Sequence, residues 1–113
     1  MLIEDLKCNG DLVPKYRKVI SGKEEEFESL ARILNLGGNP IRLKILYLLT
    51  QENNVCVNQL SEILEISISS TSQHLRKLKD CRVLKSKKEK QTVYYFINPK
   101  YKDKIPLLFK LMD

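Results

Sequence analysis

The sequence has no long hydrophobic run, and this argues against a membrane protein. No apolar stretch approaches the ~18 residues that a membrane-spanning helix needs. The N-terminal segment MLIEDLKCNGDL carries acids where a signal peptide carries basic residues, and no apolar segment follows it. We therefore expect a soluble, cytoplasmic protein with no membrane partner.

Residue types that carry catalysis are also scarce. The chain has a single histidine, and it contains no GxSxG, no HExxH and no glycine-rich phosphate loop, so we do not expect an enzyme. The three cysteines, Cys8, Cys56 and Cys81, lie far apart and form no CxxC pair, so we do not expect a disulfide framework. In a reducing compartment such thiols are free, metal-bound, redox-active or simply small buried residues.

Acidic residues are few in the C-terminal part of the chain, and this asymmetry points to an anionic partner. Residues 1–73 contain 8 Lys or Arg and 10 Asp or Glu, whereas residues 74–113 contain 12 basic and 4 acidic residues. The net charge of +6 therefore comes entirely from the second segment. A basic face of this kind favours a polyanion such as nucleic acid. The alternative at this point is a solvated, lysine-rich surface.

Hydrophobic spacing predicts a mainly helical fold with one small β-hairpin (α+β). Asn39-Pro40, Ser67 and Asn98-Pro99 are start signals for helices, and Pro106 must break or restart the last one. We expect residues 1–22 to be a partly ordered N-terminal extension and residues 23–113 to be the folded domain. The expected elements are helices at 24–36, 40–50, 58–65 and 68–80, a hairpin at 82–97 and a helical segment beyond Pro99.

Two short consecutive helices followed by a basic hairpin form the pattern of a winged helix-turn-helix. Small polar side chains at the start of helix 68–80 allow a close approach to base edges in the major groove, and longer ones reach those edges. Cations further along this helix and in the hairpin suit DNA phosphates. The alternative is a serine-rich surface helix beside an ordinary hairpin. The expected DNA-binding residues are Ser69, Ser70, Ser72, Gln73, His74, Arg76, Lys77, Lys85, Lys87, Lys88 and Lys90.

The same stretches resemble the ArsR/SmtB family of winged helix-turn-helix transcriptional repressors. The resemblance lies in LGGNPIRLKILYLL at 36–49 and in NQLSEILEISISSTSQHLRKLKDCRVLKSKKEKQTVYYFI at 58–97. It implies a homodimer that binds a double-stranded DNA operator, with helix 68–80 in the major groove and the wing at 82–97 on the backbone. It also implies dimerisation through the terminal helices, which would bury an otherwise exposed apolar patch. The residues concerned are Phe27, Leu30, Leu34, Leu107, Leu108 and Leu111.

Departures from the family pattern bear on its sensor sites. Cys56 takes the first position of the Cys-Val-Cys box of metal-sensing relatives, but Asn58 replaces the second cysteine, which leaves a poor site for a soft metal. The metal site that other relatives carry on the last helix is absent, because residues 99–113 contain no histidine. We expect no metal site and no cofactor. A thiol sensor built on Cys8, Cys56 or Cys81, a metal or thiol-reactive inducer, and purely structural cysteines stay open as alternatives.

Three further residues carry separate expectations. His74 lies inside the expected recognition helix, so it is expected to contact DNA or phosphate and not a metal. Arg82 and Lys90 stand where relatives have glycine, and a positive φ at either would cost ~1 kcal/mol.

The leading alternative function is a protein-interaction winged helix whose basic face binds an acidic partner, and an RNA-binding winged helix is a third reading.

Overall fold

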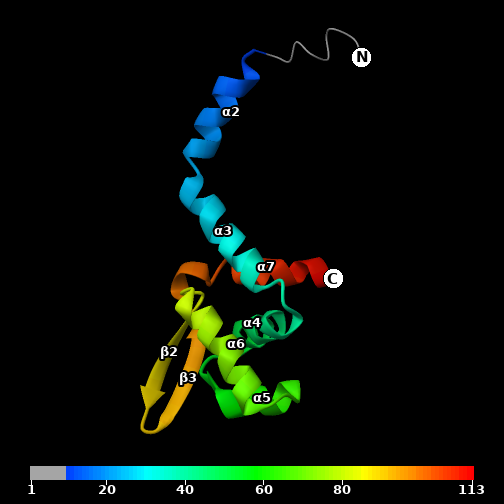
Figure 1. Ribbon diagram of the computed structural model, residues 1–113, viewed down its shortest axis with the longest axis vertical. Coiled ribbons are helices and arrows are strands. Elements are labelled where there is room, and N and C mark those ends of the chain that lie inside the picture. Colours follow the sequence, from blue (N-terminus) through cyan, green and yellow to red (C-terminus); the bar gives the residue numbers. More distant parts are fainter. Residues whose placement is uncertain (1–9) are drawn as a thin grey trace. The chain divides into compact units, whose positions relative to one another are not determined.

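The structure is a computed structural model that describes residues 10–113 (Figure 1). The chain divides into two compact units, residues 1–31 and 32–113. The elements in chain order are α2 (Leu12–Ser21), α3 (Glu24–Leu36), α4 (Pro40–Gln51), β1 (Val55–Cys56), α5 (Val57–Leu64), α6 (Ile68–Asp80), β2 (Leu84–Glu89), β3 (Thr92–Ile97), the 3-10 turn η1 (Pro99–Tyr101), α7 (Ile105–Leu108) and the 3-10 turn η2 (Phe109–Met112).

The predicted fold class is confirmed, since the second unit combines short helices with a small antiparallel sheet. Its core collects apolar side chains from helices and strands alike, and burial of this surface is the main force that holds the unit together. Figure 1 shows β2 and β3 as a hairpin that projects beside α6. The buried residues are Ile33, Leu36, Ile45, Leu46, Leu49, Val55, Leu60, Leu75, Leu78, Val83, Leu84, Tyr101 and Ile105.

The predicted helix starts are confirmed by their hydrogen bonds. The Asn39 side chain accepts from the backbone N–H groups of Ile41 at 2.9 Å and Arg42 at 3.1 Å, so it caps α4. The Ser67 hydroxyl accepts from the N–H of Ser70 at 3.0 Å and caps α6. Such side chains satisfy N–H groups that have no partner inside the helix, which is why asparagine and serine favour this position.

The sheet has a third strand that hydrophobic spacing did not predict. Its order is β1-β3-β2, and all neighbours are antiparallel. The two residues of β1 pair with the wing, Val55 opposite Tyr95 and Cys56 opposite Tyr94. A two-residue strand has no periodicity of its own, so only its tertiary pairing reveals it. The pairing joins the start of α5 to the wing.

The turn that ends α6 is closed by two backbone hydrogen bonds. The N–H of Arg82 donates to the carbonyl of Lys79 at 2.9 Å, and the N–H of Val83 donates to the carbonyl of Leu78 at 3.0 Å. This is a Schellman motif, which places Arg82 in the left-handed region where glycine is favoured. The positive φ considered from the sequence is present at Arg82 (64°) and at Lys90 (57°).

The first unit contains a helix that the sequence pattern did not predict. Within residues 10–31, α2 occupies Leu12–Ser21, inside the segment expected to be a partly ordered extension. Pro14 lies in its first turn, a position that tolerates proline because no intrahelical N–H bond is lost there. Among residues 10–113, no helix is both long and apolar enough to cross a membrane.

Candidate nucleic-acid interface

One face of α6 is buried in the core, and this fixes which side chains of the helix point into solvent. Thr71, Leu75 and Leu78 are fully buried, and they recur at the helical spacing of three and four residues. The Thr71 hydroxyl also donates to the carbonyl of Ser67 at 2.8 Å, which ties the first turn to its cap. Packing on this face therefore leaves the opposite face of the helix in solvent.

That opposite face carries most of the α6 residues predicted to bind DNA. Ser69, Ser72, Gln73, Arg76 and Lys77 are exposed along α6. The small hydroxyl side chains lie in the first turns and the cations lie towards the end. This order suits a helix whose start approaches base edges while its end meets the backbone.

Two of the predicted DNA-binding residues lie at the border between the buried and exposed faces of α6. In addition, α6 contains no acidic residue before Asp80, its last residue. Ser70 and His74 are half-buried. Between Glu65 and Asp80 the chain contains no carboxylate, so the exposed face of α6 there has only uncharged and cationic groups. A surface without acids avoids repulsion from phosphates.

The surroundings of His74 favour the neutral form of its imidazole. Burial lowers the pKa of His74 below its ordinary value of 6.5, and the positive charges of Arg42 and Lys77 lower the pKa further. A neutral imidazole has one donor and one acceptor nitrogen, so it can bind either a base edge or a phosphate.

The wing presents the four predicted lysines, all exposed, on two different faces. Lys85 and Lys87 share one face of β2, and Lys88 lies on the other. Lys90 follows β2 in the tight turn. Lys87 is not free, because its Nζ forms an ion pair with Oε1 of Glu89 at 2.9 Å. This pair was not predicted from the sequence, although residues two apart on a strand share a face.

Arg42 is a second feature whose role was not predicted. Its Nε donates to the carbonyl of Leu36 at 2.7 Å, so the side chain caps the end of α3 while it belongs to α4. The same positive charge acts on His74 in α6. This single half-buried cation therefore links the C-terminal end of α3 to the candidate interface.

The cysteines do not come together within the described chain. Cys56 is half-buried at the start of α5, where its N–H donates to Oε1 of Gln59 at 3.0 Å. Cys81 is half-buried and packs against the core at the end of α6. Both are free thiols. Cys8 lies outside the described residues. Among residues 10–113, no three His, Cys, Asp or Glu side chains are placed to hold a metal ion.

The residues expected to form the dimer differ in exposure. Phe27, Leu30 and Leu34 on α3 are each about half exposed, and Leu107 and Leu111 are more so. Leu108 instead packs against the core of its own unit. Pro106 lies in the first turn of α7, so it restarts the helical segment, one of the two outcomes predicted for it.

Comparisons with known proteins place the chain in a family. The family model described as "Bacterial regulatory protein, arsR family" matches residues 39–86, which run from the cap of α4 into the wing. The cadmium resistance regulator CadC of Listeria innocua is 43% identical over 56 residues, a match that covers 50% of this chain and 47% of CadC. The chain thus spans about half the length of that relative.

Two further relatives match over more of their length. The transcriptional repressor PagR of Bacillus anthracis is 38% identical over 82 residues, which are 72% of this chain and 82% of PagR. The structure of HlyU from Vibrio cholerae superposes with a TM-score of 0.70 and 36% identity, covering 78% of this chain and 96% of HlyU. With the helix-turn-helix matched by the family model and most of PagR and HlyU covered, the chain belongs to the arsR family of bacterial regulatory proteins.

Proposed function

We propose that the protein is a cytoplasmic, homodimeric transcriptional repressor that binds a double-stranded DNA operator. The observation that carries the proposal is the exposed face of α6, which is free of carboxylates from Ile68 to Lys79 and is followed by a lysine-bearing wing. PagR, which is similar over most of its length, is named a transcriptional repressor.

In this proposal the N-terminal half of α6 enters the major groove and reads bases. Ser69 and Ser72 are short enough to let the helix backbone approach, and Gln73 can form two hydrogen bonds with an adenine edge. The buried face of α6 supports this role, because a helix held by core packing presents its polar side chains in a fixed direction.

The wing and the end of α6 bind phosphates. Lys85, Lys88 and Lys90 are exposed, and Arg76 and Lys77 extend the positive surface along α6. Phosphate contacts set the register of the protein on DNA and carry no sequence information. Because each neutralised phosphate releases counterions, the affinity should fall steeply as salt rises.

The exposed apolar residues of α3 support a dimer. Phe27, Leu30 and Leu34 are spaced at three and four residues, so they form one stripe, and a second copy of the chain would cover it. A two-fold axis would then present two recognition helices to half-sites about 34–36 Å apart.

The experiment is fluorescence anisotropy with DNA from the region upstream of the protein's own gene, against a scrambled duplex. We expect a clear preference for the upstream duplex. Gln73→Ala and Ser69→Ala should reduce that preference by about 1–3 kcal/mol for each base that the variant no longer reads. Lys88→Gln is the matched control, and it should weaken binding to both duplexes alike.

The same titration tests the inducer. It is repeated with reductant, with oxidant, and with Zn(II), Cd(II) or As(III). Release of the DNA by one of these additions would identify the class of inducer. Equal binding to both duplexes at all salt concentrations would contradict the proposal and favour the protein-interaction alternative. If the Gln73 and Lys88 variants behaved alike, the division between base-reading and phosphate-binding residues would be wrong.

A further inference from the structure

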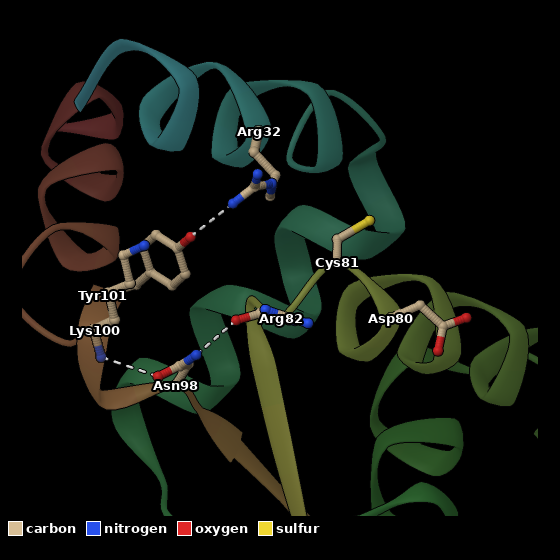
Figure 2. A pocket seen from close by; sticks show the side chains of 7 residues that line it. All are labelled: Arg32, Asp80, Cys81, Arg82, Asn98, Lys100 and Tyr101. Carbon is tan, nitrogen blue, oxygen red and sulfur yellow. Dashed lines mark hydrogen bonds between the residues drawn. The ribbon is translucent and has the colours of Figure 1, made fainter. Parts of the chain in front are cut away.

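A cleft of about 390 Å³ lies at the C-terminal end of α6, and none of the residues expected to bind DNA lines it (Figure 2). It is built within the second compact unit from segments distant in sequence: the C-terminal part of α3, the turn after α6, and the stretch from Asn98 into η1. Its lining residues are Arg32, Asp80, Cys81, Arg82, Asn98, Lys100 and Tyr101.

The cleft carries an excess of positive charge. Arg32, Arg82 and Lys100 share it with a single acid, Asp80, and Figure 2 shows the Asp80 carboxylate pointing away from the other side chains. Within residues 10–113, none of these three cations forms an ion pair with a carboxylate. Cations gathered in a concave site without acidic partners attract anions more strongly than the same charges spread over a convex surface.

Hydrogen bonds hold the arginine of α3 and the backbone of the turn in place. Tyr101 is 1% exposed, and its hydroxyl accepts from Nη1 of Arg32 at 3.3 Å. The Asn98 side chain donates through Nδ2 to the carbonyl of Arg82 at 2.8 Å and accepts through Oδ1 from the N–H of Lys100 at 3.1 Å. Figure 2 draws these three bonds around the cleft.

The lysine is positioned too. Nζ of Lys100 lies 5.6 Å from the centre of the Tyr101 ring, within reach of a cation–π interaction. The Schellman motif fixes the backbone of Arg82. The side chains of Arg32 and Lys100 and the backbone of Arg82 are therefore held in place, so less conformational entropy is lost when these cations close on a ligand.

We propose that this cleft binds a phosphate-type anion, either a free phosphorylated small molecule or a phosphodiester of the DNA backbone. A planar guanidinium gives two parallel hydrogen bonds to phosphate oxygens, and a lysine adds a point charge. The C-terminal end of the α6 dipole opposes an anion, but its partial charge of about half a unit is smaller than the charge of the three side chains together.

Occupation of the cleft would connect the end of the recognition helix to α3. The anion would bridge Arg82, which follows α6, and Arg32, which lies on the helix proposed to dimerise. An effect on DNA affinity therefore rests on the proposed function. The binding of the anion does not, so it is tested first without DNA.

Cys81 supplies the reporter, because it lines the cleft. In a Cys8→Ser, Cys56→Ser protein, the rate of alkylation of Cys81 is measured with anionic iodoacetate and with neutral iodoacetamide. Both reagents react with the thiolate, so the ratio of the two rates isolates the effect of the reagent's charge. The reference is Cys56 in a Cys8→Ser, Cys81→Ser protein.

We expect the iodoacetate-to-iodoacetamide ratio to be about tenfold higher at Cys81 than at Cys56, because a cationic cleft concentrates anions. Inorganic pyrophosphate, added at constant ionic strength, should slow iodoacetate at Cys81 and leave iodoacetamide nearly unchanged. Arg82→Gly with Lys100→Gln should bring the ratio down to the Cys56 value. Arg82→Gly keeps the left-handed turn, and circular dichroism verifies that the variant folds.

Lys102→Gln is the matched control, since Lys102 is exposed two residues beyond Lys100 and does not line the cleft. It should leave the ratio at Cys81 high. An equal ratio at the two cysteines, or no protection by pyrophosphate, would overturn the proposal. So would a ratio that the Arg82→Gly, Lys100→Gln variant leaves unchanged.

A final arm separates the two sources of the anion. The alkylation is repeated with a saturating DNA duplex, using the unmodified cleft. Protection of Cys81 from iodoacetate by the duplex assigns the cleft to a backbone phosphate. Protection by pyrophosphate but not by the duplex assigns it to a free small molecule.

Discussion

The recognition helix and the wing both present cations to solvent, but they are held in opposite ways. Thr71, Leu75 and Leu78 on α6 are 0% exposed, so the helix is anchored in the core along its length. In the wing, Leu84 is the only fully buried residue of β2, and β3 has none. Beyond Leu84 the wing is held by backbone pairing of β3 with β2 and β1 and by the partly buried side chains of Tyr95 and Ile97, which pack against the core.

This difference matches the two proposed tasks. Reading a base requires a side chain placed within a fraction of an ångström, and packing provides that precision. Binding a phosphate depends mostly on charge, so it tolerates a wing that moves. The contrast yields four predictions, and each of them tests it.

The largest effect is expected from the anchor of α6. Leu75→Ala should lower the free energy of unfolding by about 2–5 kcal/mol, because it removes a fully buried side chain and leaves a cavity. Val93→Ala, in β3 opposite Lys88, should cost about 0.2–1 kcal/mol, since this valine is 37% exposed. Urea unfolding followed by circular dichroism measures both, and equal losses would refute the contrast between the two regions.

A smaller effect, of opposite sign, is expected at the tip of the wing. Lys90 has φ 57°, and glycine adopts this conformation without steric cost, so Lys90→Gly should stabilise the fold by about 1 kcal/mol. The control is Lys88→Gly, inside β2, where glycine should destabilise. Thermal unfolding measures both variants. A lower melting temperature for Lys90→Gly would show that its side chain contributes more than its backbone strain costs.

The third prediction separates two neighbouring lysines of the wing. Lys88→Gln should reduce the salt slope of DNA binding by about 0.9 for each phosphate that the variant no longer neutralises. Lys87→Gln should reduce it less, because Glu89 already neutralises part of the Lys87 charge. Glu89→Gln should raise affinity for every duplex. Identical slopes for the two lysine variants would mean that the Lys87–Glu89 pair does not persist in solution.

Local signals explain why much of the fold could be predicted. Ser67 and Asn39 cap helices through hydrogen bonds to residues two and three positions away, so the sequence around them is sufficient. The exposed face of α6 follows from the same local periodicity that buries Leu75 and Leu78. In contrast, β1 exists only through its pairing with β3, and the sequence pattern did not predict α2, which has Pro14 in its first turn.

The candidate sites divide in the same manner. The DNA-binding residues proposed on α6 come from one helix face and were predictable. The cationic cleft was not, because Arg32, Arg82 and Lys100 meet only after the core has brought α3, the turn after α6 and η1 together. The Lys87–Glu89 ion pair is an intermediate case, because it becomes predictable once both residues are assigned to the same strand.

The smallest effect is expected at His74, which lies where the buried and exposed faces of α6 meet. Burial, with Arg42 and Lys77, lowers the pKa of His74 in the folded protein below 6.5. The unfolded chain therefore binds this proton more readily, and the stability provided by the neutral imidazole is lost as pH falls from 6.5 through the lowered pKa. Urea midpoints between about pH 5.5 and 7.5 should show the decline, and His74→Gln should flatten it.

The chain's only histidine makes the test direct, because one imidazole signal reports the pKa by NMR titration. Lys77→Gln should raise that pKa towards 6.5 by removing a nearby positive charge, and Lys79→Gln is the matched control on the same helix. DNA should act in the opposite direction to the cations, since a phosphate beside the imidazole favours its charged form and raises the pKa. An unchanged pKa on saturation with the upstream duplex would separate His74 from the phosphate-binding set and leave it as a positioning residue at the edge of the core.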